Sequence, residues 1–207
     1  MIFALKAKKR VRANPILKEV FCPYCGGEVI AKCGKIKIWH FAHKQDWACD
    51  DWKGKESDWH LEWKSNFDGP FQEVIVKKEN KRHTADIKTS NMVVEFQNSS
   101  ISSEDISKRE EFYGEMIWVM NGDTLCKNME LTPKGEIVTF RWKWPHKSWK
   151  GNTKTIYIDM GYRDLKHILL CVGKIYWDNK NGKVRGWGKI ITKEKLLGRI
   201  NDGYCGH

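Results

Sequence analysis

Apolar residues recur along most of the chain either at alternate positions or at helical spacing, and these two periods predict a mixture of strands and helices. Helical spacing covers 56–67, ended by Gly69-Pro70, and 102–116, which Ser102 or Ser103 can begin as an N-cap. A short helix over 192–200 closes the chain. Strands are expected over 1–20, 28–32, 73–78, 83–89, 92–98, 117–120, 137–143, 155–159, 168–177 and 184–191.

The order of these elements predicts an α/β (α+β) fold with a mixed β-sheet flanked by helices. A length of 207 residues allows one sizeable core and a small subdomain. The polar segment 50–55 is typical of a linker. We therefore expect an N-terminal strand and metal-binding head over 1–50, a core over 51–125, and a β-rich region over 126–207.

Charge and cysteine content narrow the class of protein. Lys and Arg number 37 against 26 Asp and Glu, a net charge of +11 that favours a polyanionic partner, most commonly nucleic acid. No apolar run is long enough to span a membrane, and 1–11 lacks the apolar region of a signal peptide, so we expect a cytoplasmic location without membrane contact. Seven cysteines are an odd number, which favours metal ligation in a reducing compartment over disulfides.

The most specific spacing lies in the N-terminal head. Cys22-x2-Cys25 is followed after fourteen residues by His40-x2-His43, and two such pairs can close a tetrahedral zinc site. A site closed by four protein ligands predicts a structural zinc ion. Cys33 and Cys49 are competing ligands, in a Cys3His set or another Cys2His2 set.

Acidic residues follow in the predicted core. The helix over 56–67 would turn Glu56 toward the protein interior, with His60 and Lys64 on the flank of the same stripe. A carboxylate in that position is costly unless it is paired or bound to a metal.

Strand alternation completes the acidic set. Asp86 shares one strand face with Thr84, while Glu95 and Gln97 share one face of the next strand. Pairing of these strands would bring the carboxylates together as an oxygen-ligand site for Mg²⁺ or Mn²⁺, the ions that assist phosphodiester hydrolysis. The alternative is that each is an ordinary solvated strand residue.

Several short motifs, in this order, resemble the CoiA-like competence protein family. The motifs cover about residues 1–120, and the final third is only loosely similar. They are Cys22-Pro23-x-Cys25, His40-Phe41-Ala42-His43, Glu56-Ser57-x2-His60-x3-Lys64, Arg82-x3-Asp86, Glu95-Phe96-Gln97-x-Ser99, and Arg109-x3-Tyr113 before Ile117-Trp118-Val119.

The resemblance implies a restriction-endonuclease-like, PD-(D/E)xK-type fold and a role in handling DNA during uptake, recombination or defence. It assigns Asp86 and Glu95 to the metal, and Gln97 to the position usually filled by a lysine. Glutamine cannot supply a positive charge, although it can orient a water molecule. If a cation is required, Lys64 or Lys88 would have to supply it.

A basic and aromatic segment over 141–154 is a further candidate for DNA contact, because cations neutralise phosphates and indoles stack on bases. The alternative is an edge strand and loop whose tryptophans pack inward. Arg109 also has the alternative of forming a polar pair in the core with Tyr113. The candidate contacts are Arg82, Arg109, Trp142, Trp144, Lys147 and Lys150.

The sequence thus predicts a Mg²⁺- or Mn²⁺-dependent deoxyribonuclease that acts on single- or double-stranded DNA. Its catalytic residues would be Glu56, His60, Lys64, Asp86, Glu95 and Gln97, and Glu56, Asp86 and Glu95 would hold the ion. Two alternatives remain: a catalytically inactive DNA-binding accessory protein on the same fold, or an adaptor for a helicase or recombinase.

Overall fold

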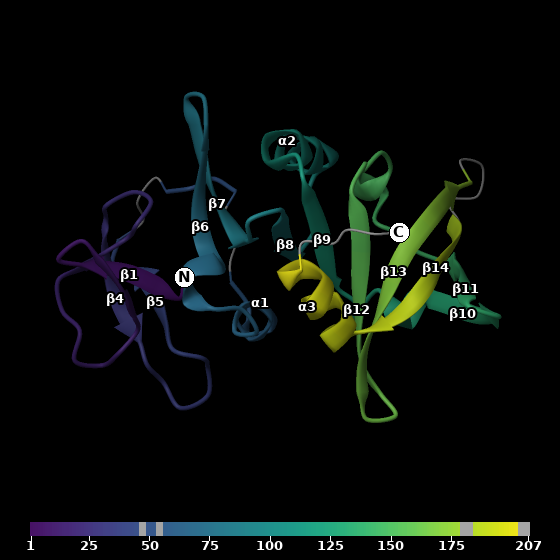
Figure 1. Cartoon of the computed structure of the whole chain (residues 1–207), viewed down its shortest axis with the longest axis horizontal. Helices are drawn as coiled ribbons and strands as arrows, with labels where there is room; N and C mark the ends of the chain where they lie inside the picture. The colour runs from purple at the N-terminus through teal and green to yellow at the C-terminus, as the bar shows by residue number, and fades with distance from the viewer. Residues whose placement is uncertain (46–48, 53–55, 179–183, 203–207) are drawn as a thin grey trace. The chain divides into compact units, whose positions relative to one another are not determined.

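The computed structural model of the chain describes residues 1–45, 49–52, 56–178 and 184–202. The chain divides into two compact units, Met1–Lys88 and Thr89–His207. The labels of Figure 1 are used for the elements of each unit.

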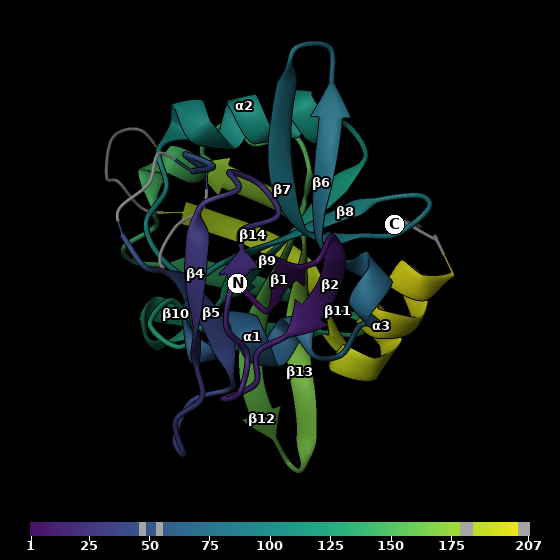
Figure 2. The same cartoon turned by 90° about the vertical axis from the view of Figure 1, so that its left-hand side faces the viewer.

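The first unit contains a small antiparallel sheet, which faces the viewer in Figure 2. Its strands lie in the order β2-β1-β3-β4-β5. Their bounds are β1 (Phe3–Lys6), β2 (Lys9–Arg12), β3 (Val20–Phe21), β4 (Glu28–Lys32) and β5 (His40–His43). The strand expected over 1–20 is therefore a hairpin of two strands followed by a third. Ala7 and Lys8 form its turn with φ of 48° and 65°, the left-handed backbone that a tight hairpin requires.

The same unit contains an α-helix, a short 3-10 helix and a second hairpin. Helix α1 (Asp58–Lys64) begins after Ser57, whose hydroxyl accepts a hydrogen bond from the backbone of His60. The helix is shorter than the 56–67 expected, because Glu56 precedes this cap. A short 3-10 helix, η1 (Gly69–Phe71), leads into strand β6 (Gln72–Lys78), which pairs antiparallel with β7 (Lys81–Lys88).

The second unit is built on a mixed sheet whose strands lie in the order β10-β11-β14-β13-β12-β9-β8. Strand β9 pairs in parallel with both β8 and β12, and the remaining pairs are antiparallel. The bounds are β8 (Val93–Gln97), β9 (Met116–Asn121), β10 (Met129–Lys134), β11 (Ile137–Trp142), β12 (Thr155–Arg163), β13 (Lys166–Trp177) and β14 (Val184–Thr192).

Helices pack against this sheet. Helix α2 (Ser103–Tyr113) begins at the cap Ser102, and α3 (Lys193–Asn201) packs on β13 and β14. Two short 3-10 helices are η2 (Cys126–Asn128) and η3 (Lys147–Trp149). The buried indole of Trp118 donates a 3.0 Å hydrogen bond to Glu110, which joins β9 to α2. The predicted mixed sheet with flanking helices is confirmed.

The sequence pattern missed strand β10. Its residues are mostly exposed, and Pro133 lies within it. A strand at the edge of a sheet can expose most of its side chains and tolerate proline, so it lacks the apolar alternation that marks an inner strand. No helix among the described residues is long and apolar enough to cross a bilayer.

Candidate metal centre and active site

Three thiols and one imidazole gather in the head. The potential ligand atoms of Cys22, Cys25, His43 and Cys49 all lie within 4.8 Å of one another. The Cys22 and Cys49 sulfur atoms are 3.8 Å apart, and the Cys25 sulfur is 3.3 Å from His43 Nε2. Three sulfur ligands and one nitrogen form a donor set typical of tetrahedral structural zinc sites. The residues present therefore fit a zinc ion, and we refer to Cys22, Cys25, His43 and Cys49 as the cysteine cluster.

His40 does not join this group, although the other three predicted ligands do. His40 and His43 lie three residues apart in strand β5, and side chains at that spacing point to opposite faces of a strand. The His40 ring instead donates a 2.9 Å hydrogen bond through Nδ1 to the Ile38 carbonyl. Cys49, one of the two competing ligands, gathers in its place, whereas Cys33 does not.

The thiols crowd one another in partly buried surroundings. Burial, reinforced by the Cys22 and Cys25 thiols, raises the pKa of Cys49 to about 12, although a backbone hydrogen bond at Asp50 opposes this. A bound cation reverses such a shift, because a metal-coordinated thiol is deprotonated.

A second polar cluster in the same unit surrounds Lys64, which is only 1% exposed. Its ammonium lies 2.9 Å from Asp86 Oδ1 and 3.3 Å from Glu73 Oε1, and it also contacts a carboxylate oxygen of Glu56. The other Glu56 oxygen is 2.5 Å from the Met1 ammonium. We refer to Lys64, Glu56, Glu73 and Asp86 as the acidic cluster.

Opposite charges set the protonation states in the acidic cluster. Burial alone would raise the pKa of Glu56, but Lys64 and the Met1 ammonium outweigh it and lower that pKa below its usual value. Burial alone would lower the pKa of Lys64, but Asp86, Glu56 and Glu73 raise it well above its usual value. Lys64 is therefore a fixed cation that contacts two of the predicted catalytic carboxylates.

Glu73 was not among the predicted site residues. Its carboxylate also accepts hydrogen bonds of 2.8 and 3.2 Å from the backbone amides of Ile2 and Phe3. A charged residue at the start of a strand ordinarily faces water, so the sequence pattern gave no signal for it. Its φ of 47° is a local strain that the surrounding contacts maintain.

Three other predicted catalytic residues have definite contacts. His60 lies in α1, where its Nδ1 is 2.8 Å from the Ser57 hydroxyl in a capping arrangement. In the second unit, Glu95 is 4% exposed and accepts a 2.9 Å hydrogen bond from the Arg109 guanidinium of α2. The Gln97 amide donates to the Ser99 carbonyl at 2.7 Å. The predicted catalytic set draws on both units, and its assembly around one ion stays a prediction.

The predicted nucleic-acid contacts divide by exposure. Trp142 is 2% exposed, because it shares the buried face of β11 with Phe140. An indole in that position cannot stack on a base. Arg109 is engaged with Glu95. The remaining candidates are exposed, and these are Arg82, Trp144, Lys147 and Lys150.

Comparisons with known proteins match two segments of the chain. Residues 5–51 match the family model "Competence protein CoiA, N-terminal domain", and residues 71–172 match "Competence protein CoiA, nuclease-like domain". The competence protein CoiA of Bacillus subtilis (strain 168) is 33% identical over 145 residues. That alignment covers 63% of this chain and 38% of the relative. No solved structure matches.

The two matched segments include every residue of the cysteine cluster and three of the predicted catalytic residues, Asp86, Glu95 and Gln97. Together they span well over half of the chain. The motifs found in the sequence, their order and both family matches agree, and the chain therefore belongs to the CoiA-like competence protein family, with a nuclease-like domain.

Proposed function

We propose that this chain is a metal-dependent deoxyribonuclease whose reacting site includes Asp86 as a ligand of a Mg²⁺ or Mn²⁺ ion. The observation that carries the proposal is the 2.9 Å contact between the Lys64 ammonium and Asp86. Asp86 lies within the segment 71–172, which matches a nuclease-like domain. A buried cation beside a carboxylate of this kind supplies the positive charge that Gln97 cannot.

The donor chemistry suits a hard divalent cation. Glu56 and Asp86 offer carboxylate oxygens, the ligands that Mg²⁺ and Mn²⁺ prefer. Their side chains are 14% and 19% exposed, so they are held by the protein and still open to solvent. A bound ion would polarise the phosphodiester and lower the pKa of the attacking water.

The chain's own residues have separate roles in this proposal. Glu56 and Asp86 would hold the ion, and Glu56 also holds Lys64 in place through its carboxylate. The Lys64 ammonium stabilises negative charge that develops on the phosphate, a role that a preorganised cation performs well in a site with little water. His60 supports the start of helix α1, whose last residue is Lys64.

The substrate follows from charge. A net charge of +11 and the exposed cations Arg82, Lys147 and Lys150 favour a polyanion, and the exposed indole of Trp144 favours one with accessible bases. We propose DNA, single- or double-stranded, as that polyanion. A zinc ion on the cysteine cluster has a structural role in the head.

A cleavage assay tests the proposal. The purified chain is incubated with plasmid and with single-stranded DNA in Mg²⁺, in Mn²⁺, and without added divalent ion in metal-free buffer. We expect divalent-dependent cutting that Asp86→Asn and Lys64→Met reduce by at least a hundredfold. Lys77→Ala is the matched control, because Lys77 is an exposed cation on β6 outside the acidic cluster.

An inactive DNA-binding accessory protein is the second candidate. The ion pair between Glu95 and Arg109 favours it, since a carboxylate already neutralised by a guanidinium is a weaker metal ligand. DNA binding without cutting in either metal would support this candidate and refute the nuclease. Neither binding nor cutting would favour an adaptor for a helicase or recombinase.

A further inference from the structure

Two of the three segments that supply the cysteine cluster also contact strand β7. Tyr24 lies between Cys22 and Cys25, and its hydroxyl donates a 2.8 Å hydrogen bond to the Arg82 carbonyl. The Arg82 guanidinium carbon lies 4.7 Å from the centre of the Tyr24 ring. The first pair of cysteines is therefore attached to β7 by a hydrogen bond and a cation–π contact.

The other attachment follows Cys49 directly. Asp50, whose side chain is 1% exposed, accepts a 2.6 Å hydrogen bond from the Thr84 amide and a 2.9 Å hydrogen bond from His83 Nδ1. The Trp52 ring stacks on His83, with centroids 3.4 Å apart and an angle of 7° between the planes. These two segments, at 22–25 and 49–52, therefore hold three consecutive residues of β7, Arg82, His83 and Thr84.

These contacts could instead mark a second metal site, because Asp50, Asp51 and His83 also place their ligand atoms within 4.8 Å of one another. The geometry favours a structural role, in which Asp50 and Trp52 hold β7 without a metal ion between them. Each Asp50 oxygen already accepts a hydrogen bond from β7, and Oδ1 accepts a further one from the Trp52 amide at 3.2 Å. Asp51 is 81% exposed, so it offers little enclosure for an ion.

We propose that metal occupancy of the cysteine cluster fixes strand β7, with Tyr24 and Asp50 as the positioning residues. A metal ion that binds Cys22, Cys25, His43 and Cys49 orders the segments on both sides of these two residues. The ordered segments then hold 82–84 in register, two residues before Asp86. That metal binding thereby positions Asp86 as a reacting group rests on the proposed function. The coupling of the metal to β7 does not rest on it.

Thermodynamic linkage makes the coupling measurable from either end. If the metal stabilises the contacts of Tyr24 and Asp50 with β7, then loss of these contacts must weaken metal binding by the same factor. Couplings between linked sites commonly correspond to between fivefold and about 150-fold in affinity. His83→Ala removes the imidazole that Asp50 and Trp52 hold, and it changes no atom of the cysteine cluster.

Zinc affinity, measured by competition with a chelator, is the first test. We expect His83→Ala to bind one zinc ion per chain about tenfold more weakly than the wild type. Lys81→Ala is the matched control, because Lys81 is an exposed residue of the same strand outside these contacts. An unchanged zinc affinity in His83→Ala would overturn the proposal. So would two zinc ions in the wild type with one lost in His83→Ala, which would assign a second metal site.

Hydrogen exchange of the β7 amides is the second test. Tyr24→Phe removes only the hydroxyl that donates to Arg82, so the fold and the cluster are retained. In this zinc-loaded variant we expect faster exchange over 82–88 than in the zinc-loaded wild type, and a smaller difference between the loaded and zinc-free forms. Equal protection of β7 in loaded and zinc-free wild-type protein would refute the coupling. Both measurements are independent of DNA cleavage, so their failure is distinct from failure of the nuclease proposal.

Discussion

Replacing Lys64 with methionine tests the acidic cluster most directly. Methionine fills a similar volume but removes the ammonium that contacts Glu56, Glu73 and Asp86. Removing one partner of a buried ion pair typically costs about 3–5 kcal/mol, because the remaining charge stays buried without compensation. We expect a loss of that size, since Lys64 is only 1% exposed and has three carboxylate neighbours.

The pH dependence of stability gives the same prediction a sign. The pKa of Glu56 is lowered in the folded protein, so its contribution is complete above its usual pKa of 4.5 and is lost as the pH falls through the lower folded value. The pKa of Lys64 is raised, so its contribution is complete below its usual pKa of 10.5 and is lost as the pH rises through the higher folded value. Between pH 4.5 and pH 10.5 the contribution of these two groups to wild-type stability is therefore constant. In Lys64→Met, acid protonates carboxylates that have lost their cation, and stability should rise as the pH falls from 7 to 5.

Urea unfolding followed by tryptophan fluorescence measures both effects, because Trp59 and Trp63 lie in the same helix as Lys64. Lys44→Met is the matched control: it removes an exposed 3.1 Å ion pair with Glu28, which should cost at most about 1 kcal/mol. If Lys64→Met and Lys44→Met lose equal stability, or if the variant shows no gain at pH 5, the reasoning about a buried ionic cluster is refuted.

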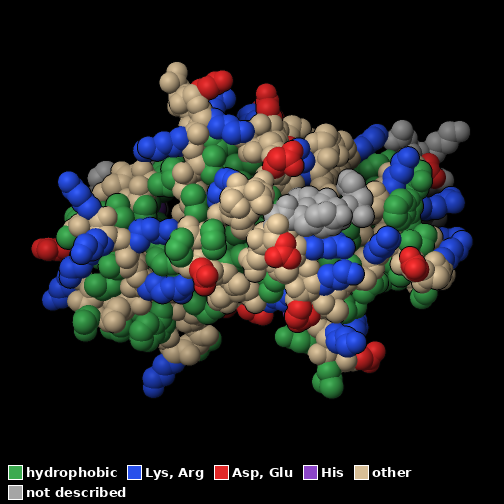
Figure 3. Space-filling view, in the orientation of Figure 1, with side chains coloured by type: hydrophobic (Ala, Val, Ile, Leu, Met, Phe, Trp, Pro, Cys, Tyr) green, Lys and Arg blue, Asp and Glu red, His purple; other side chains and the backbone are tan. Residues whose placement is uncertain are grey.

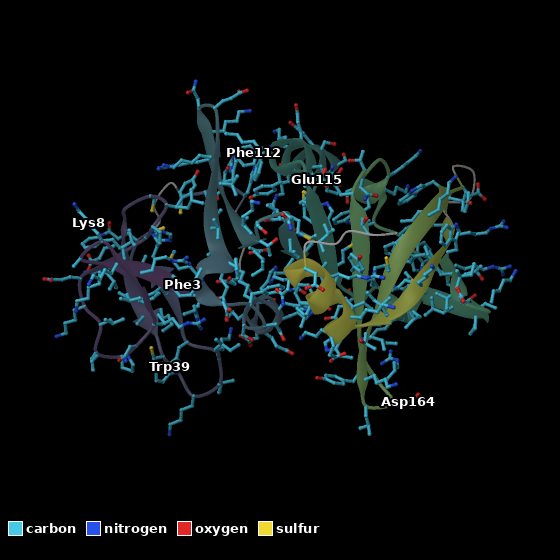
Figure 4. The ribbon with its side chains drawn as sticks, in the orientation of Figure 1. Phe3, Lys8, Trp39, Phe112, Glu115 and Asp164 are labelled. Carbon is cyan, nitrogen blue, oxygen red and sulfur yellow. The ribbon has the colours of Figure 1, made fainter. Side chains whose placement is uncertain are left out.

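Three further measurements address other sites. Cys49→Ser should lose bound zinc while His40→Ala retains it, as elemental analysis of the purified proteins would show; the reverse result would restore the set predicted from spacing. Trp144 is 76% exposed, so Trp144→Ala should weaken oligonucleotide binding by about 1–3 kcal/mol in fluorescence anisotropy, whereas Trp39→Ala, at a 47% exposed indole labelled in Figure 4 and outside the predicted contacts, should not. Ile16→Ala, at an 80% exposed position, should leave that binding unchanged, and equal effects would exclude stacking. The buried carboxylate of Glu110 accepts three hydrogen bonds, so Glu110→Gln should lower the free energy of unfolding by about 1–3 kcal/mol in a urea titration, and no loss would show that these bonds are dispensable.

Surface charge also bears on the proposed partner. In Figure 3, Lys and Arg side chains are spread over the visible face and are interspersed with acidic and apolar groups. The proposed binding to DNA would therefore use several separate cations. We therefore expect DNA binding to weaken steeply as the salt concentration rises, since each neutralised phosphate releases counterions.

Much of the local structure could be predicted because local physics determines it. Alternation of apolar and polar residues located β8, β9 and β11 to within one or two residues, and one of the two predicted caps, Ser102, begins α2. The same rules misplaced the start of α1, because Glu56 fits the apolar stripe of a helix while Ser57 provides the cap that begins it. Strand β10 was missed because an exposed edge strand carries no apolar period.

In the metal site, too, local spacing predicted some ligands and the fold decided the others. The Cys22-x2-Cys25 pair and His43 could be predicted from spacing, because two residues in a tight turn reach one metal whatever the rest of the fold does. The choice between His40 and Cys49 could not be predicted in this way. It depended on His40 and His43 lying in a strand, where residues three apart face opposite ways, and on a chain path that returns Cys49 to Cys22.

By itself, the sequence determined the types of element, the basic surface, the family motifs and the residues that could carry chemistry. Only the tertiary structure decided which of these residues meet: Lys64 with Glu73 and Asp86, and Asp50 with His83 and Thr84. The physical reason is the distance along the chain over which each interaction acts. Periodicity and capping act over a few residues, whereas a buried ion pair is stabilised only where the packing of distant segments excludes water and brings opposite charges together.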